Sequence, residues 1–300
     1  MSERDLDVVL ERGIHLNVDL LSQLERVGRR SPGISVGIRV NPRAGASWTG
    51  NRSVSPGESV YASGRPTKFG ILEEQLDEAI RIARTRGLVI DTVHAHVGDG
   101  FLTDALPHLD VAIERLAAFV VRLREAGFPV AEVNAGGGLG VPQREEDEPL
   151  DPDAYAAVLT RHLGGLGVTI ACEPGDFLAK EMGALLAEVV TVDGRDGVTF
   201  IGLDAGYNVA PERFIYGSPL VAVLARAADA RAFGPVTLAG NINEGDDLWV
   251  EHLPLPEVHE GDIVALLGVG TYNQSMHLDH CLRPPASVVA FVDRSGAPVR

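Results

Sequence analysis

Three short stretches of polar residues and glycine decide the fold of this sequence. They read His-Ala-His-Val-Gly-Asp-Gly at residues 94–100, Asn-Ala-Gly-Gly-Gly-Leu-Gly at residues 134–140 and Glu-Pro-Gly-Asp at residues 173–176. Each follows a short apolar run rich in β-branched residues, which is the pattern of a buried strand. In α/β barrels the chemistry collects at the carboxyl ends of strands, so the three stretches predict one shared site at such an edge.

The segments around these stretches alternate apolar strands with amphipathic helices. The predicted strands cover residues 34–40, 89–97, 130–135 and 168–172, and the predicted helices cover residues 72–83, 109–123 and 152–163. Gly87 and Gly127 stand where helix C-caps are expected. This alternation indicates βα units on a parallel sheet, either a doubly wound sheet or a barrel.

After about residue 180 the pattern changes to short apolar strands with little helix between them. Glycine, aspartate and proline turns separate strands predicted at residues 184–192, 198–203, 220–224, 263–267 and 288–292. We therefore expect an α/β domain over residues 1–180 and a mostly antiparallel β domain over residues 181–300.

The composition excludes several classes of function. A formal net charge of −16 at pH 7 would repel the phosphates of a nucleic acid. No apolar run approaches the roughly 18 residues that span a bilayer, and residues 1–13 lack the apolar core of a secretion signal. Two cysteines, Cys172 and Cys281, cannot build a disulfide framework. We expect a cytoplasmic protein that binds a small organic molecule, not a nucleic acid or a membrane.

Each of the three strand ends has both a structural and a functional explanation. A lone histidine such as His96 is often structural, and the glycine run 136–138 can simply form a tight turn. The same glycines can offer a nest of backbone N–H groups to a phosphate. Glu173 needs a partner after an apolar strand, and a protonated ring nitrogen would serve. Three such ends in succession favour the functional interpretation.

Together these residues resemble the fold-type III pyridoxal-phosphate (PLP) enzymes, and among them the diaminopimelate, ornithine and arginine decarboxylases. The resemblance runs over nearly the whole chain. It implies that residues 1–180 form the later part of an alanine-racemase-like, TIM-type (β/α)8 barrel and that residues 181–300 form the C-terminal β domain of a decarboxylase. Further matching motifs are Arg39-Val40-Asn41-Pro42, Lys68-Phe69-Gly70, Asp204-Ala205-Gly206, Gly270-Thr271-Tyr272 and Arg283-Pro284.

The resemblance also implies which residues hold the cofactor and act on the substrate. His96 would stack on the pyridine ring, and Glu173 would keep the ring nitrogen protonated, which makes the ring an electron sink. The implied phosphate contacts are Gly136, Gly137, Gly138, Gly175, Asp176 and Tyr272. The implied catalytic residues are His96, Asn243, Glu244 and Asp247, the last three facing a neighbouring copy's site across a dimer interface.

The sequence departs from the family at the lysine that bonds the cofactor. In the family this lysine ends the first barrel strand, whereas Leu16-Asn17-Val18-Asp19 already resembles the end of the fourth. We therefore expect five of the eight strands and no Schiff-base lysine, the rest coming from a longer reading frame or from another chain.

Three further departures fall at positions that contact the cofactor in the family. Asp99 replaces a serine, Asp176 replaces the arginine of a Glu-Pro-Gly-Arg motif and Asn243 replaces a nucleophile-like cysteine. Each new carboxylate beside a phosphate dianion is unfavourable by about 1 kcal/mol or more at an effective dielectric constant near 20.

The substrate end departs as well. Glu212 aligns with the arginine that holds the distal carboxylate in diaminopimelate enzymes, and an acid there suits a substrate with a distal amine or a neutral end. We expect Glu212, Glu244 and Arg283 to bind an amino-acid-like substrate.

Three hypotheses follow. The first is a PLP-dependent decarboxylase acting on an amino acid or an amino-acid-derived intermediate, as a homodimer. The second is a non-catalytic or partner-completed homologue, in a heteromer with a chain that supplies the missing strands. The third is a barrel repurposed to bind a metal through residues such as His94, His96, Asp99, Glu173 and Asp176; we expect no metal.

Overall fold

The chain forms two compact units, each with its own hydrophobic core. A computed structural model describes residues 1–47 and 66–290. The first unit comprises Met1–Leu178 and the second Ala179–Arg300, and a separate cluster of buried apolar side chains lies within each.

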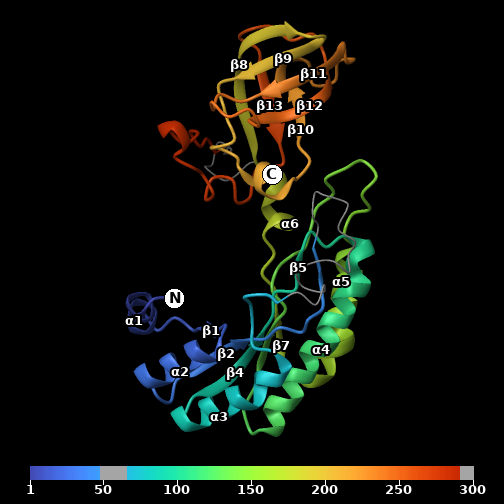
Figure 1. Cartoon of the computed structure of the whole chain (residues 1–300). Helices are drawn as coiled ribbons and strands as arrows, with labels where there is room; N and C mark the ends of the chain where they lie inside the picture. Colours follow the sequence, from blue (N-terminus) through green and yellow to red (C-terminus); the bar gives the residue numbers. More distant parts are fainter. Residues whose placement is uncertain (48–65, 291–300) are drawn as a thin grey trace, which may run out of the picture. The chain divides into compact units, whose positions relative to one another are not determined.

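A five-stranded parallel sheet forms the centre of unit 1 (Figure 1). Its strands, in sheet order, are β1 (Asn17–Val18), β2 (Ser35–Arg39), β4 (Val89–His94), β6 (Glu132–Asn134) and β7 (Thr169–Ala171). All four neighbouring pairs are parallel. A second, two-stranded sheet pairs β3 (Ala46–Ser47) with β5 (Gly98–Asp99).

Helices connect the strands of unit 1, and they lie along one side of the sheet in Figure 1. The helices are α1 (Glu3–Glu11), α2 (Leu21–Arg30), α3 (Leu76–Arg86), α4 (Leu106–Glu125), α5 (Pro152–Leu163) and α6 (Asp176–Ala179). The helix α2 packs against α3, and α4 packs against α5. Parallel strands joined by helices that pack side by side form the βα units of the later part of a (β/α) barrel.

The sequence dictates where these helices face and end. On α4 the buried side chains Leu109, Ile113, Leu116 and Val120 recur at three- and four-residue spacing and so form one face. Gly87 ends α3 in the left-handed conformation, with φ of 68°, which a residue without a Cβ adopts at little cost.

Unit 2 is a six-stranded sheet around a small core. Its strands, in sheet order, are β10 (Val221–Leu224), β13 (Ile263–Leu267), β8 (Ala184–Arg195), β9 (Val198–Leu203), β11 (Gly234–Ala239) and β12 (Leu248–Leu255). All pairs are antiparallel except β9 with β11. A short helix, α7 (Glu212–Tyr216), follows β9, and Trp249 on β12 is fully buried.

The expected fold class is confirmed in both units. The predicted strands within residues 34–40, 89–97, 130–135 and 168–172 and the helix over residues 152–163 are present. The helices α1, α2, α6 and α7 and the strands β3, β5, β11 and β12 were not predicted. The strand predicted at residues 288–292 extends beyond the described residues, and its described part, residues 288–290, is not in a strand.

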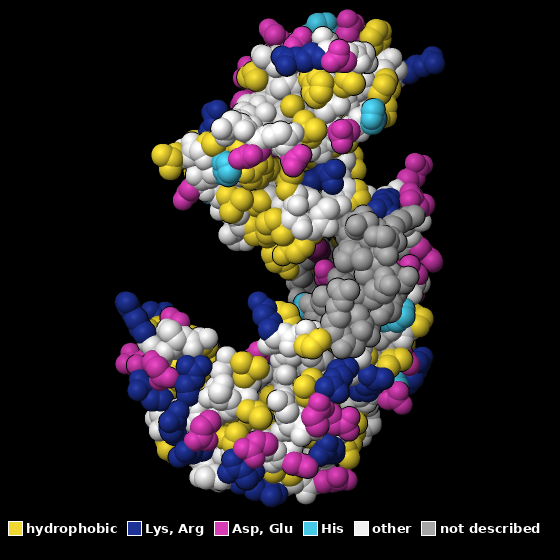
Figure 2. Space-filling view, viewed as in Figure 1, with side chains coloured by type: hydrophobic (Ala, Val, Ile, Leu, Met, Phe, Trp, Pro, Cys, Tyr) yellow, Lys and Arg dark blue, Asp and Glu magenta, His cyan; other side chains and the backbone are white. Residues whose placement is uncertain are grey.

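The surface of unit 1 is charged and mixed in sign. Figure 2 shows basic and acidic side chains interspersed over its helices, and ion pairs such as Arg86 with Glu25 and Arg122 with Asp77 join neighbouring helices. No helix within the described ranges is both long and apolar enough to cross a membrane.

Replacement of Leu116 by alanine should destabilise the chain by about 2–5 kcal/mol. The side chain is fully buried on α4, so its removal leaves a cavity under the helix. Urea denaturation followed by circular dichroism measures this change. The matched control is Val111→Ala on the same helix, whose side chain is 40% exposed, and equal losses for the two variants would contradict the assigned helix face.

Candidate active site

The register of the parallel sheet brings the predicted strand ends together. Arg39 at the end of β2 is paired with His94 at the end of β4, His94 with Asn134 at the end of β6, and Asn134 with Ala171 at the end of β7. The polar residues that follow these strands therefore share one edge of the sheet, as the sequence predicts.

Glu173 is held at this edge by two neighbouring strands. Its Oε1 accepts a hydrogen bond from Asn134 Nδ2 at 2.8 Å and lies 3.5 Å from His94 Nε2. The Glu173 side chain is half exposed. One oxygen is thus fixed by the protein while the carboxylate remains open to a cationic or N–H-bearing ligand.

His96 is held as a neutral imidazole. Its Nδ1 accepts a hydrogen bond from the Gly137 N–H at 3.2 Å, which requires an unprotonated Nδ1. Burial, followed by the charge of Arg39, lowers the pKa of His96 below its ordinary value. Burial likewise lowers the pKa of His94, against the opposing charge of Glu173.

The glycine run is required by close backbone contacts. A Cβ added at Gly136, Gly137 or Gly138 would lie 2.4 Å from a backbone oxygen of Ala95, Glu173 or Gly98, respectively. Gly136 and Gly138 also have φ of 72° and 96°, which favours glycine. The Gly136 and Gly137 N–H groups donate to Asn134 and His96, so packing alone explains the glycines and two predicted phosphate donors are engaged within the protein.

A small polar hollow adjoins His96. Its lining includes Arg39 and Asn41 from the motif Arg39–Pro42, Phe69 from the motif Lys68–Gly70, and the preceding Thr67. The Arg39 guanidinium lies 4.3 Å from the centroid of the Phe69 ring and 3.4 Å from Asp19 Oδ1. The structure thus joins two sequence motifs around His96.

The predicted phosphate residues Asp99, Gly175 and Asp176 lie on the segments that follow His96 and Glu173 in the chain. Asp99 ends β5, which pairs in parallel with Ala46–Ser47. Gly175 precedes Asp176, the first residue of α6, and the Gly175 carbonyl accepts a hydrogen bond from the Leu178 N–H. Their role toward a phosphate stays a prediction.

In unit 2, two loops meet at the buried carboxylate of Asp247. Its Oδ1 accepts a hydrogen bond from the Tyr207 N–H at 2.9 Å and its Oδ2 from the Ile242 N–H at 2.8 Å. Burial raises the pKa of Asp247, whose side chain is almost fully enclosed. This geometry gives the predicted catalytic residue Asp247 the role of fixing the loops that carry Tyr207 and Asn243.

Hydrogen bonds and an ion pair join side chains at the surface of these loops. The Tyr207 hydroxyl lies 2.7 Å from His280 Nδ1, and His280 Nε2 lies 3.3 Å from Glu244 Oε1. The Cys281 thiol donates to Asn243 Oδ1 at 2.8 Å, and Arg283 Nη2 donates to the Asn241 carbonyl at 3.2 Å. The predicted residues Asn243, Glu244 and Arg283 are thus brought together, joined by residues that the sequence had not singled out.

Glu212 is not at this surface. It is 6% exposed and forms a buried ion pair with Lys180, while its Oε2 accepts a hydrogen bond from Asn273 Nδ2 at 3.1 Å. Asn273 directly follows Tyr272, which is 54% exposed and has φ of 55°. The geometry favours a structural role for Glu212, as the anchor of the segment that carries Tyr272.

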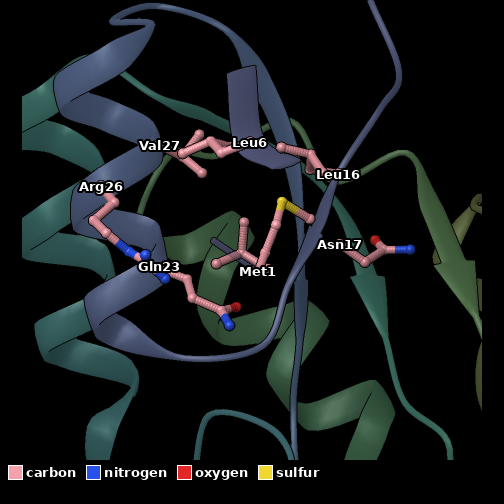
Figure 3. Close-up of a pocket in the computed structure, with 8 residues that line it drawn as sticks. Met1, Leu6, Leu16, Asn17, Gln23, Arg26 and Val27 are labelled. Atoms are coloured by element: carbon pink, nitrogen blue, oxygen red, sulfur yellow. The ribbon is translucent and has the colours of Figure 1, made fainter. Parts of the chain in front are cut away.

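One more hollow lies at the edge of unit 1, between α1, β1 and α2. Figure 3 shows it lined by Met1, Leu6, Leu16, Asn17, Gln23, Arg26 and Val27. Its lining is largely apolar and holds no carboxylate. Across residues 1–47 and 66–290, no three His, Cys, Asp or Glu side chains gather as metal ligands would, so the geometry lends the metal hypothesis no support.

The fold and the strand-end site can now be compared with known protein families. Residues 1–180 match the family described as pyridoxal-dependent decarboxylase, pyridoxal binding domain. The chain belongs to this family, as the sequence motifs predict.

Particular relatives sharpen the comparison. The chain is 34% identical to the diaminopimelate decarboxylase of Methanothermobacter thermautotrophicus over 295 residues, which cover 95% of this chain and 66% of that protein. It is 30% identical to the diaminopimelate decarboxylase of Escherichia coli K12, with coverages of 97% and 70%. The chain therefore spans about two thirds of the length of these relatives.

Solved structures agree. Helicobacter pylori diaminopimelate decarboxylase, complexed with L-lysine, superposes with a TM-score of 0.82 at 27% identity, over 95% of this chain and 70% of that one. A Chlorella virus arginine decarboxylase shares the fold, with a TM-score of 0.76 at 21% identity.

Four residues of the candidate site escaped the sequence analysis. Tyr207, Lys180 and Cys281 follow no pattern of spacing, because their partners are distant in the sequence. The sequence of Met276–Cys281 lacks the spacing of a zinc site and indicates a surface loop. His280 is partly exposed, as a surface loop residue would be, and it contacts Tyr207 and Glu244.

His94 should make the chain less stable in mild acid. Its pKa is lowered in the folded state, so between that value and about 6.5 the unfolded chain binds more protons, and stability falls as the pH falls. The variant His94→Asn should lose less melting temperature than the wild type between about pH 7.5 and about pH 5.5. Differential scanning fluorimetry measures both. His108→Asn on α4 is the control, and identical profiles for wild type and His94→Asn would contradict the assignment.

Proposed function

We propose that this chain takes part in the PLP-dependent decarboxylation of an amino acid that carries a second, cationic group. One observation supports this above the others: Glu173, held by Asn134 and His94, stands half exposed beside the neutral imidazole of His96. A fixed carboxylate next to a neutral ring suits a protonated pyridine nitrogen.

The residues of unit 1 fit the ring end of this cofactor. Glu173 would hold the pyridine nitrogen and His96 would lie against the ring. The loop of Gly136, Gly137 and Gly138 would pass beside the phosphate, with the Gly136 and Gly137 N–H groups engaged within the protein. When bound, the cofactor supplies an electron-withdrawing ring. Glu173 keeps the proton at the ring nitrogen, and Asn134 orients Glu173.

The loops of unit 2 supply the substrate end in this proposal. Glu244 is 54% exposed and offers a carboxylate to a distal ammonium group, while Arg283 offers a cation to a carboxylate. Glu212 is buried against Lys180, so we assign the distal amine to Glu244.

We further propose a homodimer, in which the loops of unit 2 face the strand-end site of a second copy, as the resemblance implies. Both cysteines are free thiols, which suits the reducing cytoplasm.

A partner-completed homologue is the second candidate. The chain has two, Lys68 and Lys180. Lys180 is 5% exposed and its ammonium is paired with Glu212, so it is not presented to a cofactor. Lys68 lies on the loop beside the hollow at His96. In this second candidate the amine that bonds the cofactor comes from another polypeptide.

Replacement of Glu173 by glutamine should reduce the release of CO2 about tenfold or more, because a charged partner of the ring nitrogen is lost. The assay supplies PLP and, in separate reactions, meso-diaminopimelate, L-ornithine and L-arginine, and collects CO2. Glu125→Gln, at the end of α4, is the charge-matched control and should leave the rate unchanged.

The same assay decides between the two candidates. CO2 release by the chain alone supports the decarboxylase. The partner-completed homologue is supported if CO2 is released only after addition of a full-length diaminopimelate decarboxylase that a Glu replacement has made inactive. No release of CO2 under either condition contradicts both candidates.

A further inference from the structure

Decarboxylation needs an acid that the motif comparison leaves unassigned. This inference rests on the proposed function: when the bond from Cα to CO2 breaks, a Cα–H bond must form, and one group has to deliver the proton. Asn243 stands where the resemblance expects a nucleophile-like cysteine, and a neutral amide does not act as an acid near neutral pH.

The other polar groups of these loops already have partners or assigned roles, and both ring nitrogens of His280 are engaged, by the Tyr207 hydroxyl and by Glu244. Both oxygens of Asp247 accept backbone N–H groups. Glu244 faces His280 Nε2, and the proposed function assigns its carboxylate to the distal ammonium group of the substrate. The Tyr207 hydroxyl is directed at His280 Nδ1, and burial and the charges of Glu244 and Asp247 raise the pKa of Tyr207, which makes it a poorer acid.

Cys281 is the remaining group of these loops that can deliver the proton. Its thiol is solvent-exposed and donates to Asn243 Oδ1 at 2.8 Å. This contact places a proton-bearing thiol beside position 243, where the resemblance expects a cysteine.

The backbone of this segment is pinned on both sides of the thiol. His280 is tied to Tyr207 before it, and Arg283 to the Asn241 carbonyl after it. Cys281 and Leu282 have φ of 54° and 55°, a left-handed conformation that costs a non-glycine residue about 1 kcal/mol or more. These contacts hold the Cys281 thiol against the loop that carries Asn243.

We propose that Cys281 is the proton donor of the unit 2 site, in place of a cysteine at position 243. The Cys281 S–H bond breaks as the Cα–H bond of the substrate forms, and the thiolate then regains a proton from water. Asn243 acts as a positioning residue, its amide oxygen orienting the S–H bond.

The first test needs neither cofactor nor turnover. Iodoacetamide alkylation of the full chain, read by peptide mass spectrometry, reports Cys281 and Cys172 in one sample. Asn243→Ala removes the acceptor that stabilises the protonated thiol, so it should speed the alkylation of Cys281 about threefold and leave Cys172 unchanged. An unchanged Cys281 rate would overturn the proposal.

The second test moves the thiol. In the CO2 assay, Cys281→Ala should lower the rate about 10²-fold, and the double variant Cys281→Ala with Asn243→Cys should recover most of it. Cys172→Ala, in unit 1, is the matched control. Full activity of Cys281→Ala, or no recovery in the double variant, would overturn the proposal.

Failure of this inference differs from failure of the proposed function. A wild type that releases no CO2 contradicts the decarboxylase function, and the alkylation result then decides the thiol's placement alone. A wild type that releases CO2 together with an equally active Cys281→Ala contradicts only the inference.

Discussion

The parallel register of β4, β6 and β7 is the constraint on which the candidate site depends. Pairing of His94 with Asn134 and of Asn134 with Ala171 sets the depth at which each strand ends. A shift of one residue would turn these side chains to the opposite face of the sheet. The hydrogen bond from Asn134 to Glu173 forms because β6 and β7 end at the same level of the sheet. The positions of His96 and the glycine loop depend on the same register.

The two units use buried carboxylates in different ways. In unit 2, Asp247 and Glu212 are enclosed and paired, and they fix loops and segments. In unit 1, Glu173 remains half exposed. A buried carboxylate with satisfied oxygens serves structure, whereas a fixed and open one can bind a ligand. Exposure therefore separates the residues that we assign to ligands from those that position them.

Much of the barrel part could be predicted from the sequence because its signals are local. Apolar spacing marked α4, Gly87 marked the end of α3, and the strand-end motifs marked His96 and Glu173. The pairing of Cys281 with Asn243, of His280 with Glu244 and of Lys180 with Glu212 could not be predicted in this way. Those contacts join residues 32 to 38 positions apart, where only the fold decides which side chains meet.

The central claim is that the edge formed by His96 and Glu173 binds the pyridine ring of the cofactor. Nitrogen-15 NMR of the histidine imidazoles, during titration with 4-deoxypyridoxine 5′-phosphate, tests this without any lysine because the analogue has the ring and the phosphate but no aldehyde. The account predicts a saturable shift of the His96 resonances, a constant His108 reference and weaker binding by Glu173→Ala. Saturable binding of the analogue without any shift of the His96 resonances would contradict it. So would equally tight binding of the analogue by the wild type and by Glu173→Ala.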